Sequence, residues 1–457
     1  MALLIKDGIL ITVDPAFRVF SKGSILIEDD KIVALGATED VIAAHSGPFT
    51  EIDARGKIIA PGLISVHNHL GYTVFRGRAE DVGAKPTPSL FLPMKQIITQ
   101  QERKTFAALG ATELLAGGVT TVLEMEEDAN IIAPFLEQLG IRAGLAIMTN
   151  DVDIPKLLNG ETSFDASLRQ QQINQSIELI ETWHNRANKR FKAFVAANMA
   201  LSCSAPLLQA LREVADRYSI GVTYHVGLGA YEVDLIQKLH GCSPFEFANR
   251  MGFLGKDAIL AHCHYMNDAD ISLLAASGAY VAHCPVLNSL RGASAPVPLM
   301  LQKGIPIALG LDNYFADYYD VMRACIAVAR VKAQDAHLLS AKDVLRFATI
   351  EAAKAMGIDQ VTGSLEVGKK ADIQLINIRK LGICPVTDPV SSLIYHAHAQ
   401  DVDTVIVDGK ILVSGGKVLS VNENDLIEEA QQCSDALWAR FAKTYASNSQ
   451  VTPITTY

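Results

Sequence analysis

The chain has 457 residues and carries 40 lysines and arginines against 50 aspartates and glutamates, a formal net charge of −10. Its hydrophobic fraction of 49% and charged fraction of 20% are those of an ordinary globular protein. The acidic balance argues against a nucleic-acid binder or a binder of anionic membranes, because either would need a basic face. We therefore expect no nucleic-acid partner.

The cysteines and the N-terminus bear on the compartment. Seven cysteines are scattered without a Cys-x-x-Cys pair, which argues against a disulfide framework and against a zinc ribbon. The apolar N-terminal stretch alternates and breaks at Asp7-Gly8, so it lacks the core of a signal peptide. No run approaches the roughly 18 apolar residues of a membrane span. These features predict a cytoplasmic protein without a membrane partner.

Both ends of the chain are rich in short β segments. Six segments have the alternation and turn boundaries of strands: residues 3–12, 24–28, 31–35, 57–60, 371–376 and 402–413. Asp408-Gly409 lies between alternating apolar residues and is typical of a hairpin turn. We predict one small β-sandwich assembled from residues 1–59 and 361–423, followed by a C-terminal helix and tail over residues 424–457.

The middle of the chain, residues 60–360, alternates apolar runs with helical patterns, which indicates parallel βα units. Eight runs qualify as strands: residues 63–66, 120–123, 143–147, 191–197, 221–224, 258–261, 280–282 and 305–309. Eight such strands with helices between them are the count of a (β/α)₈ TIM barrel. The predicted fold class is therefore α/β, and a doubly wound open sheet is the structural alternative.

Polar side chains follow four of these strands at the end where TIM barrels place catalytic groups. The first strand runs into His67 and His69, the fifth into His225, the sixth into His262 and the eighth into Asp312. The two histidines of a His-x-His pair on a strand share one face, because side chains alternate with period two. Imidazole and carboxylate ligands suit zinc or iron. The sequence therefore predicts a metal site.

Four further histidines are interpreted separately. His396 and His398 precede the terminal β-rich segment instead of ending a barrel strand, so we interpret them as structural. His264 follows the sixth strand, where its direction is open between the pocket and its rim. His283 ends the seventh strand, and we expect it to pack or bond to backbone instead of contacting a metal.

A series of motifs occurs in a fixed order along nearly the whole chain: APGLISVHNH (60–69), RG (76–77), AHC (261–263), VAHCP (281–285), APVP (295–298), ALGLD (308–312) and GSLEVGKKAD (363–372). In this order they resemble the amidohydrolase superfamily, in the branch of S-adenosylhomocysteine and methylthioadenosine deaminases and triazine hydrolases. The resemblance implies a deformed (β/α)₈ barrel with a small β-sandwich, which agrees with the strand pattern.

The resemblance also implies one divalent metal ion, zinc with iron as the alternative, whose ligands would be His67, His69, His225 and Asp312. The catalytic residues would be His262, which polarises the electrophile, and Asp312, which carries a proton from the attacking water to the leaving group. The binuclear relatives need a carboxylated lysine at the end of strand four. Asn198 occupies that place here, so we expect a single metal.

The chain departs from the deaminases of this branch at two positions. They carry a glutamate three residues after the fifth-strand histidine, which shuttles a proton to the ring nitrogen, whereas this chain has Leu228. Glu232 lies four residues further on, and we interpret it as a solvated carboxylate at the start of the next helix. Asn198 stands where these relatives often have a substrate-contacting histidine. Asn198, Leu228 and His264 are therefore the candidate substrate-binding residues.

These residues predict a metal-dependent hydrolase. Without the glutamate, attack on an aromatic ring loses proton transfer worth roughly 10²–10⁴-fold, so we favour an amide, urea or carbamate-like C–N bond, not a peptide bond. We expect a small, uncharged or weakly polar substrate and a lid formed by residues 70–99. Deamination of a purine, pyrimidine, pterin or triazine ring is the alternative function. A non-catalytic metal-containing binding protein is the second alternative. We expect a homo-oligomer, a dimer or larger.

Overall fold

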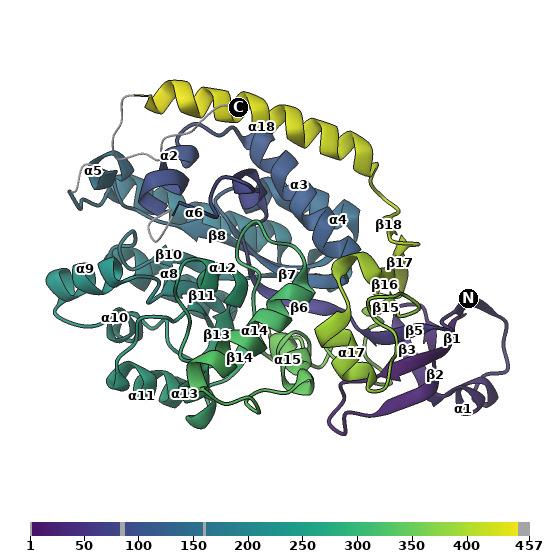
Figure 1. Cartoon of the computed structure of the whole chain (residues 1–457). Coiled ribbons are helices and arrows are strands. Elements are labelled where there is room, and N and C mark those ends of the chain that lie inside the picture. Colours follow the sequence, from purple (N-terminus) through teal and green to yellow (C-terminus); the bar gives the residue numbers. More distant parts are fainter. Residues whose placement is uncertain (1, 83–86, 159–160, 447–457) are drawn as a thin grey trace.

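The computed structural model describes residues 2–82, 87–158 and 161–446. It consists of a parallel barrel surrounded by helices and, beside it, a mixed sheet that both ends of the chain build (Figure 1). This arrangement confirms the predicted fold class and excludes the doubly wound open sheet. Residues 83–86, within the expected lid, lie outside the described residues.

The barrel strands follow one another in chain order around the sheet. They are β6 (Leu63–Asn68), β7 (Val119–Glu126), β8 (Arg142–Thr149), β9 (Phe191–Ala193), β10 (Val195–Met199), β11 (Val222–Val226), β12 (Ala258–His262), β13 (Tyr280–His283) and β14 (Ile307–Leu309). The predicted strand over residues 191–197 is thus divided, because Phe194 packs into the interior cluster between β9 and β10. All the pairings between neighbouring strands are parallel.

The ring of strands closes next to the polar residues that the sequence singles out. The Asp312 N–H donates to the His67 carbonyl oxygen at 2.9 Å, and the His69 N–H donates to the Asp312 carbonyl oxygen at 2.7 Å. Inside the barrel, alternate strand residues such as Ile64, Val66 and Ala261 form an apolar cluster. Backbone pairing therefore fixes the position of the metal-site segment relative to the last strand.

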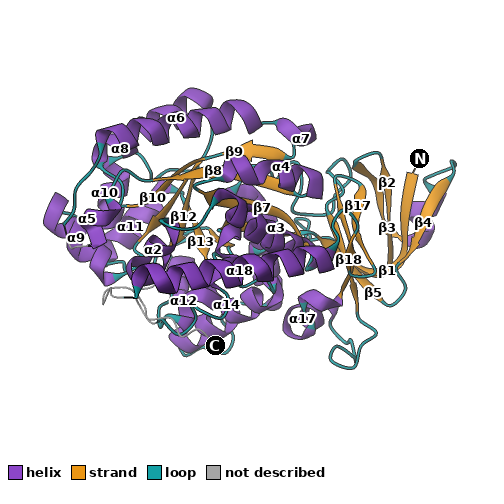
Figure 2. Ribbon diagram, turned by 90° about the horizontal axis from the view of Figure 1, so that it is seen from above, coloured by secondary structure: helices purple, strands orange, loops and turns teal. Residues whose placement is uncertain are grey.

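Helices surround the barrel in both views (Figure 2). They are α3 (Gln100–Ala116), α4 (Ala129–Leu139), α6 (Ala166–Trp183), α8 (Ala205–Tyr218), α9 (Ala230–His240), α10 (Pro244–Arg250), α11 (Asp268–Ser277), α12 (Pro285–Leu290), α13 (Val297–Gln302), α14 (Tyr318–Ala333), α15 (Ala341–Phe347) and α16 (Ile350–Ala355). Polar caps define several helix starts: the Thr99 and Asn267 side chains accept from Glu102 N–H and Asp270 N–H.

The second sheet is mixed and combines the two chain ends. Its strands are β1 (Ala2–Ile11), β2 (Val19–Glu28), β3 (Lys31–Ala37), β4 (Phe49–Asp53), β5 (Lys57–Pro61), β15 (Ile373–Asn377), β16 (Val402–Val407), β17 (Lys410–Ser414) and β18 (Lys417–Val418). Antiparallel pairing of β5 with β15 joins the two ends. Asp408 and Gly409 turn between β16 and β17 with positive φ angles of 52° and 75°, as the hairpin signal predicted. The numerical domain boundaries stay predictions.

The remaining elements include the segment over the barrel mouth and the C-terminal helix. They are α1 (Thr38–Ala43), η1 (Leu70–Phe75), η2 (Thr87–Phe91), α2 (Leu92–Lys95), α5 (Ile154–Leu158), α7 (Arg186–Lys189), α17 (Pro389–His396), η3 (Ala399–Asp401) and α18 (Glu423–Tyr445). Helix α18 packs along α3, and its Trp438 donates from Nε1 to the Val74 carbonyl oxygen at 3.2 Å. In the described part of the chain, no helix has the length and apolar character needed to span a membrane.

Candidate active site

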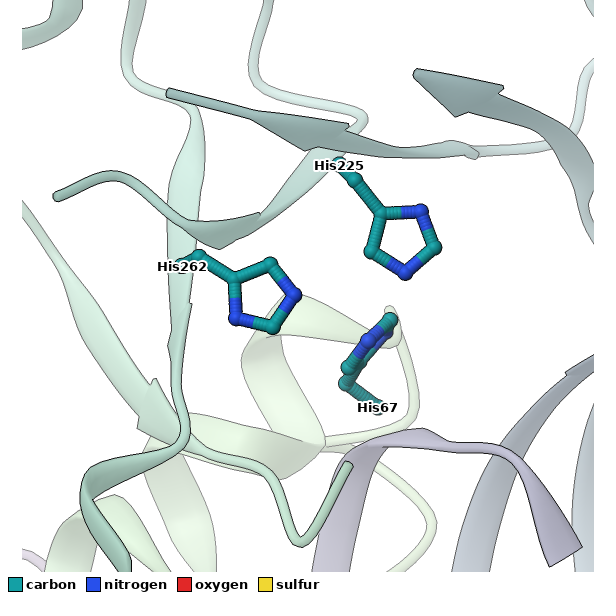
Figure 3. A group of neighbouring side chains, drawn as sticks. All are labelled: His67, His225 and His262. Atoms are coloured by element: carbon teal, nitrogen blue, oxygen red, sulfur yellow. The ribbon is translucent and has the colours of Figure 1, made fainter. Parts of the chain in front are cut away.

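Five polar side chains meet at the C-terminal end of the barrel. His67 and His69 come from β6 and its end, His225 from β11, His262 from the last position of β12, and Asp312 from the segment after β14. All five are at most 4% exposed. The rings of His67, His225 and His262 converge on one space (Figure 3). The structure thus brings together every metal-ligating and catalytic residue that the sequence predicted.

The hydrogen bonds of His69 and His225 direct two nitrogen lone pairs at each other. His69 Nδ1 lies 2.6 Å from the Met125 carbonyl oxygen, and His225 Nδ1 lies 2.5 Å from the Asn198 carbonyl oxygen. Because a carbonyl oxygen only accepts, each Nδ1 carries the proton and each Nε2 of the neutral ring is bare. The two Nε2 atoms are 3.1 Å apart. A cation bound by both nitrogens would relieve the repulsion between their lone pairs.

His67 and Asp312 complete a set of four donor residues, whose spacing can be compared with that of the ligands around a metal ion. Asp312 Oδ1 lies 3.7 Å from His67 Nε2 and 3.8 Å from His69 Nε2. Ligands about 2.1 Å from a tetrahedral zinc lie roughly 3–3.5 Å from one another, so small movements suffice to bind the ion. Both ring nitrogens of His67 are buried without a hydrogen-bond partner in the described residues. Within the described residues, two overlapping groups, His67–His225–His262 and His67–His69–Asp312, are each close enough to hold a metal ion, and their donor atoms suit a divalent metal.

Asp312 of the donor set and the adjoining His262 both have a strained backbone. His262 Nε2 lies 3.8 Å from Asp312 Oδ2, which has no hydrogen-bond partner in the described residues. The two residues have φ angles of 75° and 76°, a region that costs a non-glycine residue about 1–3 kcal/mol. Pairing of Val226 with His262 and of Asn68 with Asp312 holds this backbone in place. The fold thus holds the backbone of both residues in place beside the imidazoles.

Burial sets the protonation of the cluster. It lowers the pKa of His67, His69 and His262 well below the usual value, and that of His225 to about 4. The imidazoles are therefore neutral at neutral pH, which is the form that binds metals. Burial also raises the pKa of Asp312 to about 7, although the positive charge of Arg291 opposes this shift. A cation at the site would favour the ionised carboxylate.

Two adjoining cavities open at this end of the barrel. The first, of about 420 Å³, is lined by His69, His225, His262 and Asp312 and also by Asn198 and Leu228, two of the predicted substrate-binding residues. The second, of about 640 Å³, is lined by the third predicted residue, His264. The cavities share Thr87, Leu228 and Arg291. From the expected lid, Tyr72, Thr87, Phe91, Leu92 and Lys95 line the first cavity.

The interpretation of Glu232 as a solvated carboxylate is wrong. Glu232 lies in the first turn of α9, as expected, but is fully buried. The β11–α9 connection turns this helix position toward the core, and Glu232 Oε2 accepts the Leu228 N–H at 2.8 Å. Burial raises the pKa of Glu232 to about 7. Glu232 lines neither cavity, so it supports the loop that carries Leu228.

The other histidines lie outside the donor set. His396 and His398 are exposed at the end of α17, and His398 lies 3.4 Å from Asp317. His283 is buried, and its ring nitrogens have no hydrogen-bond partner in the described residues, so of the two expected alternatives it packs instead of bonding to backbone.

The cavity-lining residues that sequence reasoning did not name as site residues include Tyr72, Lys95 and Arg291. Tyr72 stacks on His69 with ring centroids 4.9 Å apart, and Lys95 and Arg291 bring positive charge to the first cavity. Tyr72 and Lys95 lie in the expected lid, which is the one signal that could have found them. For Arg291 no periodicity or spacing gives a signal.

Comparisons with known proteins agree with this architecture. The model of the amidohydrolase family matches residues 58–412. The 5'-deoxyadenosine deaminase of Methanobrevibacter smithii is 31% identical over 442 residues, which cover 95% of this chain and 98% of that protein. The 5-methylthioadenosine/S-adenosylhomocysteine deaminase of Desulforudis audaxviator is 30% identical over 444 residues, covering 96% and 99%.

A solved structure is similar over the same extent. The adenosine deaminase of Xanthomonas campestris with bound zinc superimposes with a TM-score of 0.86 at 25% identity, covering 96% of this chain and 98% of that chain. These matches confirm the family resemblance found in the motifs. The barrel, the convergent histidines and the full-length similarity show that this chain belongs to the amidohydrolase family.

Proposed function

We propose that this protein is a metal-dependent hydrolase that cleaves an amide, urea or carbamate-like C–N bond of a small molecule. The observation that carries the proposal is the pair of bare nitrogens of His69 and His225, 3.1 Å apart beside Asp312. This donor set has the ligands of a hydrolytic zinc site. The zinc in the Xanthomonas campestris structure supports zinc as the ion. We infer one ion, held by His67, His69, His225 and Asp312.

The side chains divide the work of the reaction. A divalent cation at this site lowers the pKa of water and polarises a carbonyl group. Asp312 Oδ2, which has no hydrogen-bond partner in the described residues, accepts the proton of the attacking water and passes it to the leaving nitrogen. His262 lies 3.8 Å away and donates an N–H to the oxygen that becomes negative. Asn198 and Leu228, which also line the cavity, bind the substrate.

The wall composition favours an amide-like bond over an amino-heterocycle. Asp312 is the one carboxylate among the described residues that line the first cavity, and Leu228 makes the neighbouring wall apolar. Attack on an aromatic carbon needs a further proton donor for the ring nitrogen, whereas amide hydrolysis needs the metal, Asp312 and His262. Deamination of a heterocycle is the second candidate, because the relatives at 30–31% identity are deaminases.

A substrate panel tests the proposal and ranks the two candidates. The zinc-loaded protein is assayed for ammonia and amine release from amides, ureas, carbamates, adenosine, guanine and cytosine. We expect turnover of members of the first three classes. Fast deamination of a nucleobase would reverse the ranking. If the protein holds one zinc per chain but turns over no compound, the alternative of a non-catalytic metal-containing binding protein is favoured.

The expected homo-oligomer stays a prediction, which light scattering coupled to size-exclusion chromatography tests. The cytoplasmic location also stays a prediction, and cell fractionation tests it.

A further inference from the structure

Arg291 is a cation at the junction of the two cavities. It follows α12 as the C-terminal cap, is partly buried, and lines both cavities. Its guanidinium lies 5.5 Å from the centre of the Phe91 ring, which comes from the segment over the barrel mouth. A planar guanidinium stacked on a ring keeps a fixed orientation, so its N–H groups are presented to the cavities in one geometry.

Arg291 forms no ion pair among the described residues, and Asp312, the carboxylate of the first cavity, interacts with it only at longer range. Its Nε and Nη2 atoms are buried without a hydrogen-bond partner in the described residues, and the neutral Tyr314 hydroxyl lies beside it. The other cavity-lining cation differs, because Lys95 is 2.9 Å from Glu127. A partly buried guanidinium whose N–H groups lack partners is stabilised by an anion that pairs with it directly. The unpaired N–H groups of Arg291 are thus able to bind an anionic ligand.

The second cavity supplies further polar groups and no acid. Asn288 is 1% exposed, and both its Oδ1 and Nδ2 atoms lack a hydrogen-bond partner in the described residues. His264 lines the same cavity, and burial lowers its pKa to about 3, so it is neutral. None of the described residues that line this cavity is a carboxylate. An anion here would meet hydrogen-bond donors and no like charge.

We propose that the substrate carries a carboxylate, which Arg291 and Asn288 bind in the second cavity while the reacting C–N bond lies in the first. One guanidinium matches one negative charge, and its parallel N–H groups match the two oxygens of a carboxylate. This proposal rests on the proposed hydrolytic function. It also revises the expectation of an uncharged or weakly polar substrate.

The kinetic test uses matched substrate pairs. N-acyl and N-carbamoyl amino acids are offered to the zinc-loaded protein as free carboxylates and as neutral primary amides. We expect kcat/KM to favour the carboxylate by at least about 10-fold, chiefly through KM. Arg291→Gln should remove this preference, and Arg291→Lys should restore part of it. Arg217→Gln is the control, because Arg217 also lies over an aromatic ring, 5.2 Å from that of Tyr218, but is exposed on α8.

A binding measurement separates this proposal from the function on which it rests. Calorimetry compares phenylacetate, phenylacetamide and inorganic phosphate on zinc-loaded wild type and Arg291→Gln. We expect phenylacetate affinity to fall at least about 10-fold in the variant, even if no compound of the panel is hydrolysed. Equal phenylacetate affinity in both proteins would overturn the proposal, since direct binding to zinc would not depend on Arg291. A larger Arg291-dependent loss for phosphate would overturn the carboxylate assignment.

Discussion

Two buried polar clusters lie at opposite ends of the barrel, and they differ in how their charges are satisfied. At the start of β8, Arg142 donates to Asp372 Oδ2 at 2.8 Å and Oδ1 at 3.1 Å, and to Asp408 Oδ1 at 3.2 Å. The Asp408 N–H also donates to Asp372, and Asn188 donates to Asp408. This cluster ties the barrel to the mixed sheet with groups that the chain itself provides.

The cluster at the other end, the histidines and Asp312 of the candidate site, has polar atoms without hydrogen-bond partners among the residues that the structure describes. Both ring nitrogens of His67, Nδ1 of His262 and Oδ2 of Asp312 have no hydrogen-bond partner in the described residues. Buried polar atoms are ordinarily paired, so a group of unpaired ones marks a place where a ligand supplies the partners. The comparison teaches that burial alone does not distinguish a structural cluster from a functional one, whereas a convergence of several unpaired polar atoms does.

The largest effect is expected on stability, when the hydrogen-bonded cluster of Arg142, Asp372 and Asp408 loses one of its carboxylates. Asp372→Ala leaves Arg142 buried with one partner fewer, and we expect the free energy of unfolding to fall by about 3–5 kcal/mol. Zinc content per folded chain should not change, because the metal site lies at the opposite end. Urea denaturation and elemental analysis measure both. Glu246→Ala, which removes an exposed pair with Arg250, is the control and should cost at most about 1 kcal/mol.

Substitutions in the unpaired cluster of the candidate active site should lower turnover. Asp312→Asn keeps an oxygen for the metal but removes the proton acceptor, so we expect kcat to fall at least about 10²-fold while zinc occupancy falls modestly. His262→Asn should damage kcat and spare the zinc. Steady-state kinetics and zinc per chain check both variants. Near-normal turnover of Asp312→Asn would place proton transfer elsewhere, and His264 would be tested next, because Glu232 lines neither cavity.

The sequence predicted the parts of this molecule that depend on local periodicity. His67 and His69 could be placed at a strand end because apolar runs and turns mark the strands, and the barrel topology then brings His225 and Asp312 to the same rim. The mixed sheet followed from alternation at both chain ends. None of these predictions depends on knowing the course of a loop.

What the sequence could not predict depends on loop paths and packing. Glu232 has the sequence context of an exposed helix start, and its burial follows from the course of the β11–α9 connection, in which Gly227 has a φ of 65°. Arg291 reaches the cavities because the segment after β13 packs against Phe91, which lies about 200 residues earlier in the chain. Such contacts between distant segments leave no local pattern.

A change in the cavity wall tests whether the missing glutamate decides the reaction. Leu228→Glu places a carboxylate in the first cavity, and we expect at least about a 10-fold gain in ammonia release from an amino-heterocycle that already binds. Burial would raise the pKa of the new side chain, which limits the gain. Leu228→Gln is the matched neutral control and should give none. If both variants stay inactive with normal zinc content, cavity shape decides instead.

His283 provides the most selective test, because it is buried and unpaired yet belongs to neither cluster. Burial lowers its pKa to about 4, against about 6.5 in the unfolded chain. Between these pH values the unfolded state binds more protons, so stability rises with pH by up to about 1.4 kcal/mol per pH unit from this group and levels off above pH 6.5. His283→Gln should remove that slope in urea unfolding experiments.

Adding zinc distinguishes a histidine that is only buried from one that binds the metal, because it changes the pH dependence of stability only for the ligand. A ligand is held neutral by the metal, so its contribution to the pH dependence changes when zinc is added. We expect the difference in slope between wild type and His283→Gln to be the same with and without zinc, because His283 lies in none of the potential donor groups found among the described residues. A difference that changes on zinc addition would place His283 in the metal site, and hydrogen-bond satisfaction would then identify ligands even outside the predicted set.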